Sequence, residues 1–79
     1  MTQTEATWLY KDEEVVIITA PPFATTFKEG DIVVLKRTRI SGSYKAFGQY
    51  DSWWVEDCNV VPLLLKAPEW TKEVASRWS

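Results

Sequence analysis

Residues 15–37 read VVIITAPPFATTFKEGDIVVLKR, and this stretch decides the fold class. Its two ends, Val15–Ala20 and Ile32–Arg37, are short continuous runs rich in β-branched residues, which predict buried strands. Pro21 and Pro22 end the first run, because a proline cannot donate a hydrogen bond to a sheet ladder. The stretch therefore predicts two strands with a loop between them.

The loop between these strands contains its own signals. Phe23 and Phe27 are its two aromatic anchors, and Lys28–Asp31 is typical of a turn. Gly30 is the residue in that turn that can adopt a positive φ at no steric cost.

The segment that follows predicts a third and a fourth strand. Residues 38–51 are a long polar and aromatic loop or a ragged hairpin, punctuated by glycine and serine. Ser52–Glu56 is predicted as a strand, and Asp57–Asn59 suits a tight turn. Val60–Leu65 is predicted as an edge strand, because Pro62 interrupts it.

The last segment, residues 67–78, predicts a C-terminal helix. Pro68 suits a first helical turn, and Trp70, Val74 and Trp78 recur at the spacing of one helical face. Both runs of the opening stretch are apolar on both faces, so something must cover the second face of the sheet. Closure into a barrel, the C-terminal helix and a partner are the three alternatives.

The whole chain of 79 residues is predicted to be a single domain, 1–79, with residues 1–7 as a flexible polar start. The formal net charge is −2, and five tryptophans are many for this length. No apolar run is long enough to span a bilayer, and the polar N-terminus is not a signal peptide. Cys58 cannot form an internal disulfide because it is the only cysteine. These features favour the cytoplasm, and small acidic chains of this kind occur among bacterial and phage accessory proteins.

The order of several short motifs resembles the SH3 family. These motifs are the turn at residues 25–31 (TTFKEGD), the apolar strand, the long loop, Trp53-Trp54 and then Val61-Pro62. The resemblance covers about residues 8–65 and implies a small, strongly bent SH3-like barrel of four to five strands that serves binding. It also implies that Trp53, Pro62 and Tyr10 occupy peptide-binding positions of that family. The predicted fold is therefore mainly β, an SH3-like barrel with a short C-terminal helix.

Catalysis is disfavoured by the residue inventory. Without histidine there is no Ser-His-Asp or Cys-His arrangement, and one cysteine leaves no zinc site of the usual ligands. The carboxylates at 12–14, Asp51, Glu56 and Asp57 are able to do acid–base work or bind a divalent ion weakly, but a solvated acidic surface is the favoured interpretation. The sequence therefore predicts no enzyme, no cofactor and no metal.

The tryptophan pair is the most informative feature for binding. On a strand Trp53 and Trp54 point to opposite faces. Alternation with Val55 and Glu56 places Trp53 in the core and Trp54 at the surface, whereas the SH3 resemblance implies the reverse. The sequence leaves both possibilities open.

The first functional hypothesis is a non-catalytic protein-interaction module, an accessory subunit, adaptor or inhibitor that binds a partner protein through an aromatic surface. Its candidate contacts combine the tryptophan pair, three loop aromatics and two arginines at the rim: Trp54, Trp53, Tyr44, Phe47, Tyr50, Arg37 and Arg39.

Two alternatives accompany it. Cations interleaved with aromatics suit single-stranded nucleic acid, and the alternative nucleic-acid contacts are Lys36, Arg37, Arg39 and Lys45. Strands that are apolar on both faces also allow a homodimer.

Overall fold

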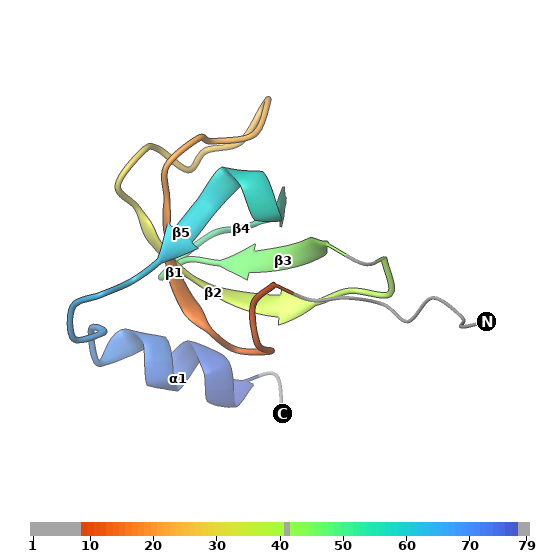
Figure 1. Cartoon of the computed structure of the whole chain (residues 1–79). Coiled ribbons are helices and arrows are strands. Elements are labelled where there is room, and N and C mark those ends of the chain that lie inside the picture. Colours follow the sequence, from red (N-terminus) through yellow and green to blue (C-terminus); the bar gives the residue numbers. More distant parts are fainter. Residues whose placement is uncertain (1–8, 41, 78–79) are drawn as a thin grey trace.

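The computed structural model describes residues 9–40 and 42–77 (Figure 1). It contains one five-stranded sheet, and the order of its strands is β4-β3-β2-β1-β5, with every pair antiparallel. The elements in chain order are β1 (Val15–Ile18), β2 (Ile32–Arg37), β3 (Ser43–Phe47), β4 (Ser52–Glu56), the 3-10 turn η1 (Asp57–Asn59), β5 (Val60–Pro62) and α1 (Trp70–Arg77). The prediction of a mainly β fold with a short C-terminal helix is confirmed. Within the described residues no ladder joins β4 to β5, and the SH3-like barrel stays a prediction.

The strand boundaries differ from the predicted ones in three places. β1 ends at Ile18, before the predicted Ala20, and β5 ends at Pro62, before the predicted Leu65. A complete strand, β3, lies inside the segment 38–51, of which only a loop or ragged hairpin was expected. The helix occupies residues 70–77 of the predicted 67–78, and Trp78 lies outside the described residues, as does the segment 1–7.

One face of the sheet forms the core. Alternate residues of the five strands point to this face, and loop residues join them in one cluster. Its buried members are Tyr10, Val16, Ile18, Phe27, Val33, Leu35, Tyr44, Ala46, Val55 and Val60. Because so few side chains make up the core of a domain this small, each of them carries a large share of its stability.

The outer face of the sheet is covered in part by α1. Val34 points to this face and is nevertheless fully buried. The helix packs against β2 (Figure 1). Its Thr71 and Val74 side chains are buried. Of the three predicted ways to cover the second face, the structure shows the helix.

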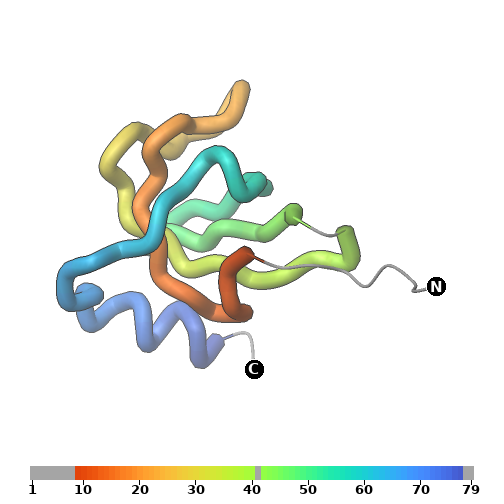
Figure 2. Tube along the Cα trace, viewed as in Figure 1, coloured from red at the N-terminus to blue at the C-terminus, as the bar shows by residue number. Residues whose placement is uncertain are grey.

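The loop from Thr19 to Asp31 leaves the sheet as a projecting arm (Figure 2). Its base is closed by two hydrogen bonds: the Gly30 N–H donates to the Ile18 carbonyl at 2.7 Å and the Ile18 N–H to the Asp31 carbonyl at 2.8 Å. Gly30 has a φ of +95°, so the predicted role of this glycine is confirmed. On the far side, the Thr26 hydroxyl donates to the Asp51 carboxylate at 3.3 Å and ties the arm to the turn between β3 and β4.

Candidate interaction surface

The tryptophan pair occupies β4, which is an edge strand of the sheet. Trp53 lies on the core face, partly buried and packed against the core cluster. Trp54 lies on the outer face and is 55% exposed. The alternation-based prediction is therefore confirmed, and the reverse orientation implied by the SH3 resemblance is wrong.

The Trp54 ring is held on two sides although it faces solvent. The Lys45 ammonium lies over it, with Nζ 3.7 Å from the ring centroid. Lys45 reaches this position because it pairs directly with Trp54 across the β3–β4 ladder. The Trp53 ring meets the Trp54 ring edge to face, with centroids 5.9 Å apart. An exposed aromatic ring that is already oriented loses little freedom when a partner binds it.

A shallow hollow adjoins Trp54 at the sheet edge. It has a volume of about 300 Å³, and its lining comes from the β3–β4 hairpin, the projecting arm and η1: Pro22, Ser43, Trp54, Val55, Glu56 and Asn59. The Asn59 side chain connects the two sides of this hollow. Its oxygen accepts the Glu56 N–H at 2.7 Å, and its NH₂ group donates to the Ala20 carbonyl at 2.8 Å. The arm and β4 are thus fixed relative to each other.

Tyr44 is not available as a surface contact, and its prediction as an aromatic anchor is wrong. It belongs to β3 and is fully buried in the core. Its hydroxyl oxygen accepts the Tyr10 N–H at 3.0 Å, and the two rings meet edge to face. Burial is the largest cause that raises the pKa of the Tyr44 phenol, so this group stays neutral.

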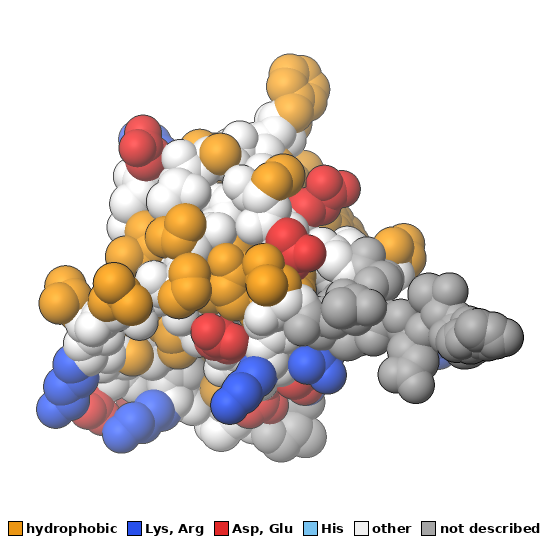
Figure 3. Space-filling model, viewed as in Figure 1, with side chains coloured by type: hydrophobic (Ala, Val, Ile, Leu, Met, Phe, Trp, Pro, Cys, Tyr) orange, Lys and Arg blue, Asp and Glu red, His pale blue; other side chains and the backbone are white. Residues whose placement is uncertain are grey.

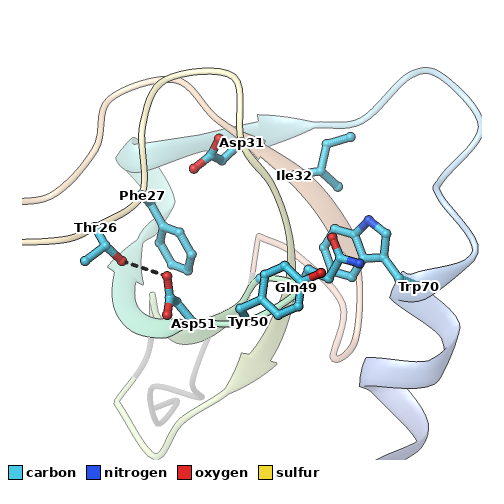
Figure 4. A pocket seen from close by; sticks show the side chains of 9 residues that line it. Thr26, Phe27, Asp31, Ile32, Gln49, Tyr50, Asp51 and Trp70 are labelled. Atoms are coloured by element: carbon cyan, nitrogen blue, oxygen red, sulfur yellow. Dashed lines mark hydrogen bonds between the residues drawn. The ribbon is translucent and has the colours of Figure 1, made fainter.

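The other two predicted loop aromatics, Phe47 and Tyr50, differ in their exposure to solvent. Phe47 is the last residue of β3; it lies on the outer face, where it is half-buried and pairs with Val34. Tyr50 stands in the turn between β3 and β4 and is 88% exposed. It borders a second hollow of about 250 Å³, between the arm and the start of α1 (Figure 4).

Most of the predicted basic contacts already have partners within the chain. Lys36 forms ion pairs with Asp12 at 3.3 Å and Glu13 at 3.7 Å. The Arg37 guanidinium donates to the Tyr10 carbonyl at 3.4 Å. Lys45 is engaged with Trp54, as described above. Arg39 is exposed in the turn between β2 and β3.

The residues that the SH3 resemblance implies as peptide contacts differ in their exposure. Tyr10 is buried, and its hydroxyl donates to the Val60 carbonyl at 3.1 Å. Trp53 of β4 is partly buried against the core cluster, and Pro62 of β5 is exposed. Tyr10 is therefore not available as a surface contact, whereas Pro62 is.

Asp12 is the carboxylate with the clearest electrostatic role. Partial burial acts to raise its pKa, but the Arg37 N–H, which it accepts at 2.9 Å, and the Lys36 ammonium outweigh this effect and lower the pKa below its ordinary value. A carboxyl group whose pKa is lowered on folding stabilises the folded state above its unfolded pKa, and this contribution is lost as the pH falls through the folded pKa.

We expect the substitution Asp12→Asn to lower the free energy of unfolding at neutral pH by up to about 1 kcal/mol, because the group is well exposed to solvent. The difference between the two proteins should shrink as the pH falls through the lowered pKa of the wild-type carboxyl group, because that group is then protonated too. Urea unfolding from pH 2 to pH 7 measures it. A difference that is independent of pH would show that shape and not charge matters at residue 12.

Among the described residues, sequence reasoning missed the most exposed aromatic side chain. Phe23, expected only as a loop anchor, is 96% exposed on the projecting arm. It follows Pro22, which lines the hollow beside Trp54. The signal was available, since the motif Pro-Pro-Phe-Ala cannot continue a strand and so carries its aromatic residue away from the sheet.

Exposed aliphatic residues were missed as well. Val61, Leu64 and Leu65 were expected in or beside a strand that ends at Leu65, and all three are exposed. Because the chain leaves the sheet after Pro62, the two leucines stand in the connection to α1. Hydrophobic side chains accordingly gather along this face of the molecule (Figure 3).

Two features are absent from the part of the chain that the structure describes. Within 9–40 and 42–77 there is no group of three or more residues suited to hold a metal ion. The same part of the chain has no helix with the length and apolar character that crossing a membrane requires. Cys58 is exposed in η1.

Comparison with known proteins identified no relative of this chain. No protein-family model matches the chain, and no match was found among curated proteins or among solved structures.

Proposed function

We propose that this protein is a non-catalytic protein-interaction module that binds a partner protein through the outer surface around Trp54. The observation that carries the proposal is an exposed indole ring held in place by Lys45 and Trp53. Tryptophan is among the residues that most often dominate the energy of an interface. The exposed Phe23 of the adjoining arm supplies a second apolar contact.

The proposed mechanism is occupation of the partner's surface, as an accessory subunit, adaptor or inhibitor does. An apolar side chain of the partner would pack on the exposed outer side of the Trp54 ring. Glu56 beside it would favour a cationic neighbour. Arg37 and Arg39 of the predicted rim are both exposed, and Arg37 also donates to the Tyr10 carbonyl. No bond is made or broken in this mechanism.

The alternative of nucleic-acid binding has less support. It requires cations that are available to phosphates, but Lys36 is paired with carboxylates and Lys45 covers an aromatic face. It predicts affinity that falls steeply with salt. Binding through Trp54 predicts a weak dependence on salt.

Affinity capture from a lysate of the source cells, with and without nuclease, tests the proposal. A protein that is retained in stoichiometric amount after nuclease treatment supports the interaction module and identifies the partner by mass spectrometry. Material that disappears on nuclease treatment contradicts it and favours the basic residues as the site.

We expect Trp54→Ala to weaken binding of the captured partner about 30-fold or more, as for a central interface tryptophan. Leu64→Ala is the matched control, because Leu64 is also exposed but lies in the connection between β5 and α1. Titration calorimetry with the purified partner measures both. Equal affinities for the two variants would place the interface elsewhere.

A further inference from the structure

The two edges of the sheet differ in how well they are protected. At the β5 edge, the Thr19 N–H donates to the Asn59 carbonyl at 2.9 Å. This hydrogen bond fixes which backbone groups of β5 point toward β1 and which point away from it. In an antiparallel ladder the inward and outward backbone groups alternate. Pro62 therefore faces outward, and it has no N–H to offer a further strand. Prolines are a common means of closing a sheet edge.

The β4 edge has no such protection. The Gly48 N–H donates to the Asp51 carbonyl at 2.7 Å and the Asp57 N–H to the Gly42 carbonyl at 3.2 Å. By the same alternation, the backbone groups of Trp53 and Val55 face β3, and those at positions 52, 54 and 56 face outward.

The outward groups of β4 are largely open. The Glu56 N–H is taken by the Asn59 side chain at 2.7 Å. Within the part of the chain that the structure describes, no backbone hydrogen bond outside the strand ladders involves Ser52 or Trp54. β4 also carries neither proline nor lysine, the usual residues that keep an edge strand from pairing.

Antiparallel pairing of β4 with β4 of a second copy provides hydrogen-bond partners for the open backbone N–H and carbonyl groups of this edge. With the two-fold axis at Trp53, Ser52 of each copy lies opposite Trp54 of the other, and both exchange N–H and carbonyl hydrogen bonds. This register does not need the occupied Glu56 N–H. It also places Trp53 against Trp53 on the core face.

Charge selects this register over its neighbour. With the axis at Trp54 instead, Asp51 of one copy would lie opposite Asp57 of the other, and like charges directly across a ladder destabilise it. With the axis at Trp53, Asp51 lies opposite Val55, and the uncharged turn residue Gln49 lies nearest to Asp57, so no like charges are opposed.

The same register brings two otherwise unexplained features together. It brings the β3–β4 turn of the second copy, which carries Tyr50, to the end of β4 at Glu56, and Glu56 lines the hollow beside Pro22 and Trp54. Tyr50 is almost completely exposed in one chain. Seated in the hollow of the other copy, the Tyr50 ring would be buried. A symmetric dimer contains two such contacts, one at either end of the paired strands.

We infer that this protein forms a symmetric dimer in which the β4 strands pair about Trp53 and Tyr50 of each copy enters the hollow of the other. This inference does not depend on the proposed function. The outer side of each Trp54 ring stays open, so the dimer presents two such surfaces on one continuous sheet.

Sedimentation equilibrium of the purified chain tests the inference across micromolar to millimolar concentration. The wild type should approach twice the 9.1 kDa mass of one chain. Ser52→Pro removes one outward N–H without touching the β3–β4 ladder, and it should weaken dimerisation about tenfold or more, while Ser52→Ala should not. Circular dichroism establishes that both variants are folded.

A second pair of variants avoids the risk that proline disturbs the strand. Glu56 of the second copy lies diagonal to Ser52 on the outer face, within reach of a long side chain. Ser52→Glu should therefore weaken the dimer and Ser52→Lys should not, with the difference shrinking at high salt.

Three results would overturn the inference: a monomer at every concentration, a dimer as strong in Ser52→Glu as in Ser52→Lys, or a dimer unaffected by Tyr50→Ala. None of them bears on capture of a partner by Trp54, because the partner is absent from these measurements.

Discussion

Tyr44→Ala is expected to lower the free energy of unfolding by about 3–5 kcal/mol, the usual cost of removing a large buried aromatic side chain. Tyr44 has no exposed surface, and its ring packs edge to face on Tyr10 with centroids 5.9 Å apart. A domain of this size has a net stability of roughly a few kcal/mol. The variant should therefore be largely unfolded at room temperature.

Tyr44→Phe separates the ring from the hydroxyl. It leaves the Tyr10 N–H, which donates to the Tyr44 hydroxyl at 3.0 Å, without its acceptor. The expected cost is about 1–3 kcal/mol, the penalty for an unsatisfied buried donor. Urea unfolding followed by tryptophan fluorescence measures both variants. A Tyr44→Ala protein as stable as the wild type would contradict the burial of this residue and restore it as a surface contact.

Val74→Asp is expected to produce the second largest effect, about 3 kcal/mol of lost stability, because a carboxylate cannot be buried without a partner. Val74 is buried where α1 packs on β2. To solvate the new charge the helix must leave the sheet, and Val34 on the outer face would then be exposed. Loss of helical circular dichroism and altered Trp70 fluorescence should accompany the loss of stability.

Ser76→Asp is the matched control, since it adds the same charge at an exposed position of the same helix. A carboxylate in the last helical turn costs only a few tenths of a kcal/mol. If Val74→Asp were no more destabilising than Ser76→Asp, the helix would not be the cover of this sheet face.

The sequence predicted those elements whose residues agree with their position in the fold. β2 and β4 have the predicted bounds, because an apolar β-branched run and a tryptophan pair next to valine each suit a strand between turns. The orientation of Trp53 and Trp54 followed from the two-residue period of a strand. The position of β5 at a sheet edge followed from Pro62.

β3 was missed because serine and glycine surround it and indicate a loop. Its own residues alternate between polar and apolar, which favours a half-buried strand, but the run is short. In the structure Ala46 pairs with Leu35, and Tyr44 meets Tyr10. Tyr44 was consequently assigned to the surface, since an aromatic residue in a polar loop and one in a buried strand have the same sequence context.

The candidate surface was predicted only in part for a related reason. Exposure of Trp54 and Tyr50 could be inferred, but the hollow beside Trp54 joins Pro22, Glu56 and Asn59, which are far apart in the chain. Similarly, a count of cations does not reveal that Lys45 lies on an aromatic ring and that Lys36 is paired with Asp12.

The pairing of β1 with β5 has a consequence for the kinetics of folding. Val16 pairs with Pro62, so this ladder joins residues from near the two ends of the domain, whereas β2, β3 and β4 are connected by short turns. The entropy lost on closing so long a loop must precede any gain from the contacts it brings. We therefore expect the β2–β3–β4 meander to form first and the β1–β5 pair to close last. In that order, the outward backbone groups of β4 in the nascent meander are available to other chains before the β1–β5 pair has formed.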